Sequence, residues 1–336
     1  MIWYATKCII CESPRIITFK KKKFEMNTHS NWVAESTLEL LDEIECRASY
    51  KFCTACNHFF RDPLYTDSLL YTENASNVRA KAYKKYTGGD YNAEAVIAVG
   101  GNVKKGFEFT ANQLIKQAVI AKRIGKKFLK QNPGQKIKIL DYGAGAGYFI
   151  DLYELIFNKV LCFKDVEFYA YDLGTQEASS TQRKGAKFIV DLEELKRIAP
   201  FDIICCSDVL EHIASPVEFT KQISHLLREN GTLFLEVPLE LNALREQTGP
   251  SFHISCFTKN SLRMLLALSG FSKISVYANA FSSYRGAPCS TVQAVGVKSS
   301  TPGRFYFPRW CSLITDLLKS FIAGVVRVLT RKIEKQ

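Results

Sequence analysis

The sequence predicts an α/β fold, built as a doubly wound, seven-stranded sheet that ends in an antiparallel hairpin. From about residue 107 onwards, short apolar runs alternate with amphipathic stretches. Strands that alternate with helices in this way form a parallel sheet covered on both faces. The last two apolar runs follow each other without a helix between them, which predicts the hairpin at one edge of the sheet.

The expected elements follow from the spacing of apolar residues along this region. Seven apolar runs predict strands at 136–142, 166–171, 186–190, 201–206, 232–237, 273–279 and 290–297. Helical periodicity predicts helices at 109–129, 148–157, 175–184, 192–198, 216–228 and 258–269. The turn signal Asn132-Pro133-Gly134 ends the first helix before the first strand begins.

Length and composition fit one large domain with additions. The 336 residues are 47% hydrophobic and 23% charged, close to the average of soluble domains. We expect a cysteine-bearing domain at 1–65, a connector at 66–106, the α/β domain at 107–300 and a C-terminal helix within 301–336. The chain starts without an export signal and has no apolar run of roughly 20 residues, so a cytoplasmic location is expected.

The net charge of the chain is strongly positive. Lys and Arg number 45 against 33 Asp and Glu, which gives a formal charge of +12. Such a charge favours acidic partners, such as nucleic acid, anionic lipid or phosphorylated substrates, without choosing among them. A local run such as Lys20–Lys23 is more often a solvated face than a binding site.

A glycine-rich turn follows the first predicted strand and carries the most information. Asp141 ends the strand, and Gly143, Gly145 and Gly147 follow at alternate positions. Glycines permit positive φ and a close approach of the backbone to a ligand, and the next helix offers free N–H groups. The spacing differs from the dinucleotide motif G-x-G-x-x-G, and a carboxylate would repel a pyrophosphate. It fits S-adenosylmethionine (SAM), whose ammonium can face Asp141.

Polar residues also end the next three predicted strands. Asp172 ends the second, where a carboxylate can accept hydrogen bonds from ribose hydroxyls. Asp191 and Leu192 follow the third strand, where an adenine would be flanked, and Ser207 follows the fourth. An alternative, in which the acids are ordinary helix N-caps, has less weight because Asp141, Asp172 and Asp191 occur together.

These motifs resemble those of the class I SAM-dependent methyltransferases, which share a Rossmann-like sheet. The resemblance is carried by Asp141-x-Gly-x-Gly-x-Gly147, by Tyr171-Asp172 and by the run 201–212, which ends in Val-Leu-Glu-His. That ending is similar to the ubiquinone-type O-methyltransferases. The passage His253-Ile-Ser-Cys-Phe-Thr258, followed by Gly270-Phe271, is similar to the same group. The resemblance implies SAM as the cofactor and leaves the acceptor open.

Two histidines are candidates for the base that an alcohol acceptor requires. His212 and His253 each follow a strand at the carboxyl edge of the sheet, where ligands bind in doubly wound folds. Asp208 and Glu211 are expected to orient a histidine, to touch the acceptor, or to hold a divalent cation with His212. The alternatives are structural histidines and acids that cap a helix N-terminus.

Two CxxC pairs near the N-terminus offer ligands for a metal. Cys8, Cys11, Cys53 and Cys56 supply the four thiolates of a structural Zn²⁺ site, which leaves no open coordination position. About 40 residues separate the pairs, against the 15–20 of the common zinc pattern, so Cys46 or His58 is an alternative ligand. Eleven cysteines, an odd number, indicate reduced thiols.

The metal-binding segment is similar to the N-terminal zinc ribbon of sugar C-methyltransferases and other methyltransferases of glycan biosynthesis. We expect no further C-terminal domain after the C-terminal helix, and in this the chain departs from the sugar C-methyltransferases. The resemblance implies structural zinc, and it favours a glycan acceptor, as in polysaccharide biosynthesis, without deciding the acceptor.

The C-terminal segment 313–333 reads as a basic amphipathic helix, with apolar residues on one face and Lys and Arg on the other. The favoured interpretation is a helix packed on the domain or on a second copy of the chain, as in a homo-oligomer. The other is peripheral contact with an anionic membrane surface, on the inner face of the membrane.

Four functions remain open on the sequence alone. The leading one is a SAM-dependent methyltransferase acting on a small-molecule or glycan acceptor, with a saccharide or nucleotide sugar favoured. The others are an O-methyltransferase of a quinone-like or other aromatic acceptor, an RNA methyltransferase, and a non-catalytic SAM-binding protein. Only the net charge supports a nucleic-acid partner, which is therefore disfavoured.

Overall fold

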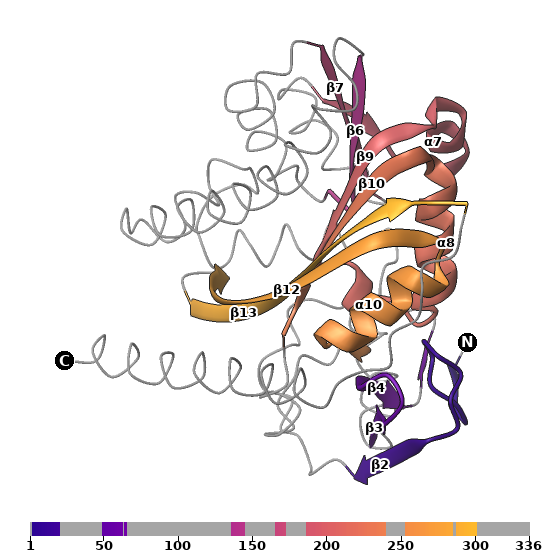
Figure 1. Ribbon diagram of the computed structural model, residues 1–336, viewed down its shortest axis with the longest axis vertical. Coiled ribbons are helices and arrows are strands. Elements are labelled where there is room, and N and C mark those ends of the chain that lie inside the picture. The colour runs from indigo at the N-terminus through magenta and orange to yellow at the C-terminus, as the bar shows by residue number, and fades with distance from the viewer. Residues whose placement is uncertain are drawn as a thin grey trace, which may run out of the picture.

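The computed structural model describes residues 2–20, 49–62, 64–65, 136–144, 165–172, 186–239, 253–284 and 287–300. Within this part of the chain, a seven-stranded sheet carries three α-helices on one face, and a smaller sheet lies beneath the last of these helices (Figure 1). The three helices are α7 (Leu192–Ile198), α8 (Pro216–Leu226) and α10 (Lys259–Leu268).

The large sheet has the strand order β12-β13-β10-β9-β6-β7-β8. Its strands, in chain order, are β6 (Ile137–Tyr142), β7 (Val166–Tyr171), β8 (Lys187–Ile189), β9 (Phe201–Ser207), β10 (Leu227–Pro238), β12 (Phe271–Tyr284) and β13 (Ala287–Lys298). The five strands from β10 to β8 pair in parallel, while β13 pairs antiparallel with both β10 and β12. The predicted α/β fold, with seven strands and a terminal antiparallel hairpin, is confirmed.

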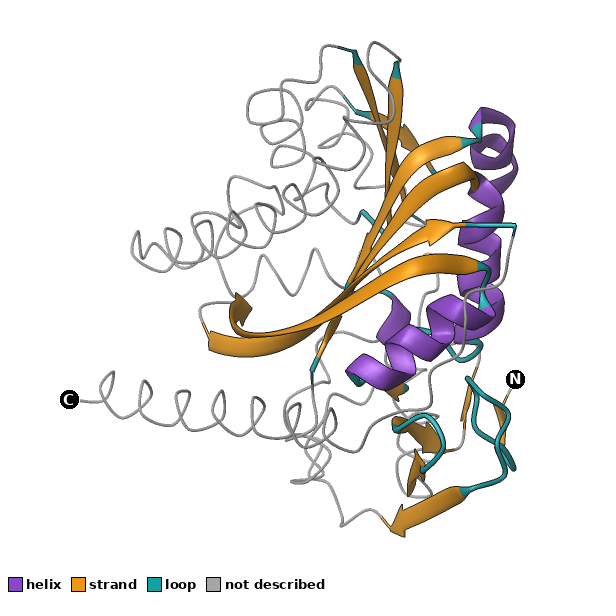
Figure 2. Cartoon of the chain, viewed as in Figure 1, coloured by secondary structure: helices purple, strands orange, loops and turns teal. Residues whose placement is uncertain are grey.

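Both faces of the large sheet are apolar, as expected for parallel strands buried on two sides. In β6, Leu140 and Tyr142 belong to the core shared with α7, α8 and α10, whereas Ile137 and Ile139 belong to a second core on the opposite face. The three described helices all cover the first of these faces (Figure 2). The helices predicted at 109–129, 148–157 and 175–184 lie outside the described residues.

The helix boundaries follow local capping chemistry. Helix α7 has the predicted bounds, and its N-cap Asp191 accepts a hydrogen bond from the Glu193 N–H. Helix α10 begins after Thr258, which forms a capping box with Ser261. Helix α8 ends at Leu226, two residues before the predicted end. Arg228 instead belongs to β10, and its Nε lies 2.5 Å from Asp202 Oδ1 in β9.

Several strands are longer than the sequence predicts. Strand β10 begins five residues early, because Leu227 pairs with Phe201 before an irregularity shifts the register at Thr232. Asn230, at φ 62°, lies in this irregular stretch. Strands β12 and β13 extend the hairpin beyond the other strands of the sheet (Figure 1).

The N-terminal segment forms a second sheet with the order β11-β4-β3-β2. Its strands are β2 (Ile16–Lys20), β3 (Ser49–Cys53), β4 (His58–Asp62) and β11 (Ser255–Cys256). A separate antiparallel pair joins β1 (Ile2–Trp3) to β5 (Leu64–Tyr65). Strand β11 comes from within the region predicted as the α/β domain, so residues about 200 positions apart in the sequence complete one sheet.

The predicted connector at 66–106 and C-terminal helix at 313–333 lie outside the described residues. In the part of the chain that the structure describes, no helix is both long and apolar enough to cross a bilayer.

Candidate active site and metal centre

The glycine-rich turn is held against the end of β7. The N–H groups of Gly143 and Ala144 both donate to the Tyr171 carbonyl, at 2.8 and 3.1 Å. These bonds bring the turn beside Asp172, the next residue after Tyr171. The predicted cofactor residues Asp141, Gly143 and Asp172 therefore lie at one edge of the sheet, the carboxyl edge of its parallel strands.

Gly143 is required at this turn for two reasons. Its φ is +80°, in the left-handed region that favours glycine. A Cβ at this position would also lie 2.3 Å from Val209 Cγ2. Val209 follows β9 directly after Asp208, so the glycine turn and the loop that carries the predicted catalytic residues are in contact. The sequence analysis assigned no role to Val209, because the contact joins residues far apart in the chain.

Asp141 fits a cationic group of the cofactor. Its side chain is buried, and Oδ2 has no hydrogen-bond partner among the described residues. Burial, and then the charge of Asp172, raise the pKa of Asp141 to about 8. A buried carboxylate needs a cation or hydrogen-bond donors to remain ionised. The ammonium of SAM, predicted at this position, would meet that need.

The structure describes three of the other predicted cofactor residues and leaves two outside the described part of the chain. Ser207 is buried at the end of β9. Leu192 is the first residue of α7, and Asp191 Oδ1 accepts from the Glu193 N–H at 2.8 Å. The N-cap interpretation thus accounts for one oxygen of the Asp191 carboxylate, and its cofactor role stays a prediction. Gly145 and Gly147 lie outside the described residues.

Three of the four predicted catalytic residues come together. Glu211 and His212 lie on a 3₁₀ helix, η4 (Leu210–His212), and His253 precedes β11. His212 Nε2 lies 3.8 Å, and His253 Nε2 4.0 Å, from Glu211 Oε1. The two imidazole rings meet edge to face, with centroids 4.8 Å apart.

The chemistry of this cluster follows from its burial. Glu211 is 2% exposed, and both histidines are largely buried. The Glu211 carboxylate lies beside both rings, where it can orient a histidine that accepts a proton. The three residues also offer one ligand atom each within 4.8 Å of one another, an arrangement that could hold a divalent cation.

Asp208, the fourth predicted catalytic residue, sits in a strained backbone conformation. Its φ is 55°, and its N–H donates to the Glu236 carbonyl at 3.0 Å. Glu236 is itself buried, and Gln293 Nε2 donates to its Oε2 at 2.5 Å. The sequence analysis missed Glu236 and Gln293, whose polar character inside apolar strands was the available signal.

The four predicted metal ligands converge. Cys8 Sγ lies 3.5 Å from Cys56 Sγ, and Cys11 Sγ lies 3.5 Å from Cys53 Sγ. All four sulfurs lie within 4.8 Å of one another. Zn–S bonds of 2.3 Å in a tetrahedron place the sulfurs about 3.8 Å apart, so the four side chains fit this ion.

The two CxxC turns are built alike. The residue after each second cysteine has a left-handed backbone, with φ 54° at Glu12 and 59° at Asn57. Each donates its N–H back to the first cysteine of its pair, Glu12 to the Cys8 carbonyl and Asn57 to the Cys53 carbonyl. The Ile10 N–H also points at Cys8 Sγ, 3.5 Å away. The repeated turn aims both cysteine pairs at one point.

Without a cation, the thiols compete for protons. Hydrogen bonding with Cys11 is the largest cause that lowers the pKa of Cys53 well below its usual range. It is also the largest cause that raises the pKa values of Cys8 and Cys56. A dication that binds all four sulfurs as thiolates would end this competition.

His58, the alternative ligand, is part of the core instead. It is fully buried, and burial lowers its pKa to about 3, so the ring is neutral. Its ring stacks with Phe60 and packs against Phe257, at centroid distances of 5.7 and 4.9 Å. The four cysteines form the cluster without it. Cys46, the other alternative, lies outside the described residues.

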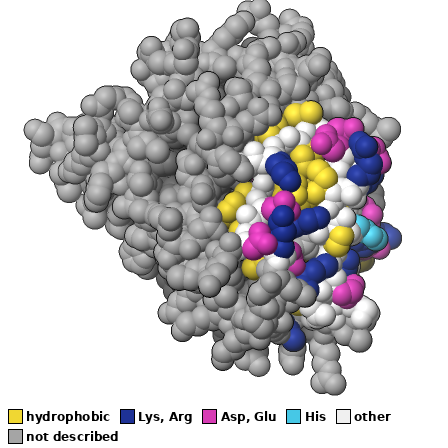
Figure 3. All heavy atoms as spheres, turned by 90° about the horizontal axis from the view of Figure 1, so that it is seen from above, with side chains coloured by type: hydrophobic (Ala, Val, Ile, Leu, Met, Phe, Trp, Pro, Cys, Tyr) yellow, Lys and Arg dark blue, Asp and Glu magenta, His cyan; other side chains and the backbone are white. Residues whose placement is uncertain are grey.

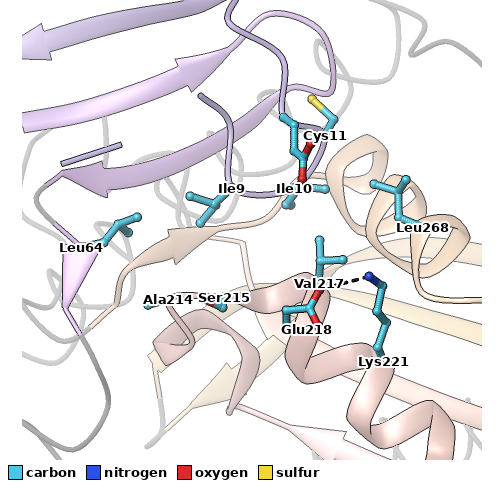
Figure 4. A pocket seen from close by; sticks show the side chains of 11 residues that line it. Ile9, Ile10, Cys11, Leu64, Ala214, Ser215, Val217, Glu218, Lys221 and Leu268 are labelled. Carbon is cyan, nitrogen blue, oxygen red and sulfur yellow. Dashed lines mark hydrogen bonds and ion pairs between the residues drawn. The ribbon is translucent and has the colours of Figure 1, made fainter. Parts of the chain in front are cut away.

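A cleft of about 430 Å³ separates the first CxxC turn from the start of α8 (Figure 4). Ile9, Ile10 and Cys11 line one side, and Val217 and the ion pair between Glu218 and Lys221 line the other. Ala214 and Ser215, which follow η4, lie in the same wall. The cysteine cluster therefore lies close to the loop that carries Glu211 and His212.

Comparisons with known proteins identify a methyltransferase domain in this chain. A family model described as "Methyltransferase domain" matches residues 113–276. The ubiquinone biosynthesis O-methyltransferase of Xylella fastidiosa is 27% identical over 115 residues. That match covers 32% of this chain, and the chain spans 44% of the length of that relative.

Solved structures of methyltransferases are also similar. The magnesium protoporphyrin IX methyltransferase of Synechocystis, with bound SAM, has a TM-score of 0.41 and 17% identity, covering 68% of this chain and 98% of its own. The DszA carbon methyltransferase has a TM-score of 0.45 and 16% identity, covering 69% of this chain and 68% of its own. From the family match and the glycine-turn site together, we conclude that the chain carries a class I SAM-dependent methyltransferase domain.

Proposed function

We propose that this methyltransferase transfers the methyl group of SAM to a hydroxyl oxygen of a small-molecule or glycan acceptor, and that the acceptor is a saccharide or nucleotide sugar. The observation that carries the proposal is the cluster of Glu211, His212 and His253. It lies on and beside the loop that contacts the glycine turn through Val209.

The proposed chemistry divides the work between cofactor and protein. SAM, when bound, supplies a methyl group on a sulfonium, which is already reactive towards an oxygen nucleophile. The protein aligns the acceptor and removes its proton. An imidazole nitrogen of His253 or His212 accepts the proton from the acceptor hydroxyl, and the Glu211 carboxylate stabilises the imidazolium. Asp141 and Asp172 hold the cofactor at the adjacent edge.

The glycan preference is supported by the four-cysteine cluster, the feature that resembles glycan methyltransferases. We assign it a structural Zn²⁺, held by Cys8, Cys11, Cys53 and Cys56. A second candidate acceptor is a quinone-like phenol. It is favoured by the similarity to a ubiquinone biosynthesis O-methyltransferase. Both acceptors would use the same base, so the cluster of Glu211, His212 and His253 does not distinguish between them.

A transfer assay with SAM labelled in its methyl group tests the proposal. Purified protein is incubated separately with nucleotide sugars, lipid-linked glycans, quinone precursors and total RNA. We expect label in a sugar or glycan fraction. Glu211→Gln and His253→Gln should lower the turnover by about 100-fold or more, with the SAM affinity retained. His225→Gln is the matched control, because His225 is exposed on α8.

Three outcomes would contradict the proposal in different ways. Label only in the quinone fraction would show that the acceptor is aromatic. Label only in RNA would show that the acceptor is a nucleic acid, as the positive net charge alone would suggest. Full activity of Glu211→Gln would show that the cluster is not the base.

A further inference from the structure

We propose that the four-cysteine metal centre positions His253, so that metal occupancy controls the acceptor side of the active site while leaving the SAM side unaffected. The catalytic meaning of this coupling rests on the proposed function. The coupling itself depends only on three hydrogen-bonded ties, which link the cysteine turns to residues 254–258 and these residues to η4.

The first tie is a strand pairing. Strand β4 begins at His58, two residues after the metal ligand Cys56, and it pairs antiparallel with β11. Ser255 lies opposite Phe60, and the Arg61 N–H donates to the Ile254 carbonyl at 2.8 Å. The segment that directly follows His253 is therefore held along its backbone by the strand that leaves the second CxxC turn.

The second tie starts from the CxxC turn itself. The Thr258 hydroxyl donates to the Asn57 carbonyl at 3.0 Å. Asn57 is the left-handed residue after Cys56, and its conformation belongs to the turn that aims Cys53 and Cys56 at the metal. Thr258 and Asn57 are both buried, so the bond is protected from competition with water.

The third tie completes the link to the catalytic cluster. The Ile254 N–H donates to the Glu211 carbonyl at 2.8 Å. Ile254 thus bonds with its carbonyl to β4 and with its N–H to η4. His253 is the adjacent residue, so its position relative to Glu211 is set from both sides.

The cofactor turn has different supports. Asp141 and Gly143 follow from β6, which pairs with β7 and β9, and the turn bonds to Tyr171. Among the described residues, the backbone hydrogen bonds of this turn run to β7 and none runs to the cysteine segment. When the metal leaves, the two CxxC turns lose the ion that joins them, which would release the turn at Asn57. The loss of a fixed conformation at this turn should affect His253, through Thr258 and β4, before it affects Asp141.

Substitutions at Thr258 test the coupling in the metal-loaded protein. Thr258→Val removes the donor to Asn57, whereas Thr258→Ser retains it. Ser261→Ala is the matched control, because Ser261 shares the capping box of α10 with Thr258 but does not bond to Asn57. The readouts are bound metal, the SAM dissociation constant, the imidazole NMR signals of His253, and kcat/KM for the acceptor. His253→Gln assigns the signals among the five histidines of the chain.

The expected pattern separates the two sides of the site. Thr258→Val should shift the His253 signals and lower kcat/KM for the acceptor by about tenfold or more, with the SAM dissociation constant changed by less than about twofold. Thr258→Ser and Ser261→Ala should resemble the parent protein. Withdrawal of the metal should move the His253 signals as well, while those of His225 on α8 stay in place.

Two results would overturn the coupling. One is an unshifted His253 signal in both Thr258→Val and the metal-free protein. The other is a loss of SAM affinity equal to the loss of turnover, which would indicate general unfolding. A shifted signal with unchanged turnover would instead support the coupling and refute the role of His253 as base, so the two proposals fail separately.

Discussion

At the residue scale, Asp141 links cofactor binding to pH. Burial raises its pKa to about 8, so the carboxyl is protonated at pH 6.5 before SAM binds. An ammonium beside the carboxyl would favour the ionised form. We therefore expect SAM binding to release about one proton at this pH. Calorimetric titration in buffers of different ionisation enthalpy measures the release directly.

Asp141→Asn is the control for this prediction. It should abolish the proton release and weaken SAM binding by about 10- to 100-fold, because a hydrogen bond to a charged group is lost. The folded-state pKa lies above the unfolded value of 3.8. The cofactor-free parent should therefore lose stability as the pH rises from about 4 to about 8, and the variant should not. Equal proton release in both proteins would contradict the assignment.

Among the glycines that the structure describes, Gly143 is the position where an added methyl group should cost most. Gly143→Ala places a Cβ against Val209 and forces an L side chain into φ +80°. We expect a loss of about 3 kcal/mol in the free energy of unfolding, combining backbone strain with overpacking. Chemical denaturation measures the loss, and SAM affinity should fall with it.

Two further variants separate the causes of that loss. Gly270 has a similar φ of +86°, with only Ser224 Oγ near its Cβ position, at 4.0 Å. Gly270→Ala should therefore cost only the backbone part, about 1 kcal/mol. Val209→Ala combined with Gly143→Ala should recover the steric part. Additive effects of Val209→Ala and Gly143→Ala would show that the contact between them is not the cause.

At the scale of elements, the sequence predicts what local patterns control. Helix α7 and strand β7 have their predicted bounds, because each shows its own periodicity and has a local boundary signal: Asp191 caps the start of α7, and Asp172 follows β7. The predicted end of α8 was wrong by two residues. Arg228 belongs to β10 instead, where it forms an ion pair with Asp202 of β9. That ion pair joins separate elements, and helical periodicity carries no sign of it.

Strand β11 shows the limit of such prediction more clearly. It has only two residues, and its partner β4 lies nearly 200 positions earlier in the chain. The passage from His253 to Thr258 was recognised as a motif in the sequence, but the sequence did not indicate which strand it pairs with. The same applies to the catalytic cluster. Glu211, His212 and His253 were predicted one by one, while their approach to a common point depends on the pairing of β11.

At the scale of the whole molecule, the net charge is +12, and Figure 3 shows how charged side chains are distributed over the described part of one face. In the part of that face that the structure describes, Lys and Arg side chains lie among Asp and Glu side chains and apolar patches. Nucleic-acid interfaces use a continuous basic stripe. The described part of this face shows no such stripe.

The shared sheet has a consequence for unfolding. Strand β11 joins the cysteine-bearing sheet to the loop of Glu211, and Thr258 joins it to α10. Elements that share buried hydrogen bonds unfold cooperatively. We therefore predict one thermal transition for the metal-loaded protein in differential scanning calorimetry.

Metal removal should act on that same transition. Because structural zinc contributes folding free energy outright, a strong chelator should lower the single midpoint by about 10 °C or more. SAM should raise the midpoint of both the loaded and the metal-free protein, since Asp141 and Gly143 depend on β6 and β7. Two separate transitions, with only the lower one sensitive to the chelator, would instead show that the cysteine-bearing segment folds as an independent domain. In that case the pairing of β4 with β11 would be too weak to transmit the state of the metal to His253.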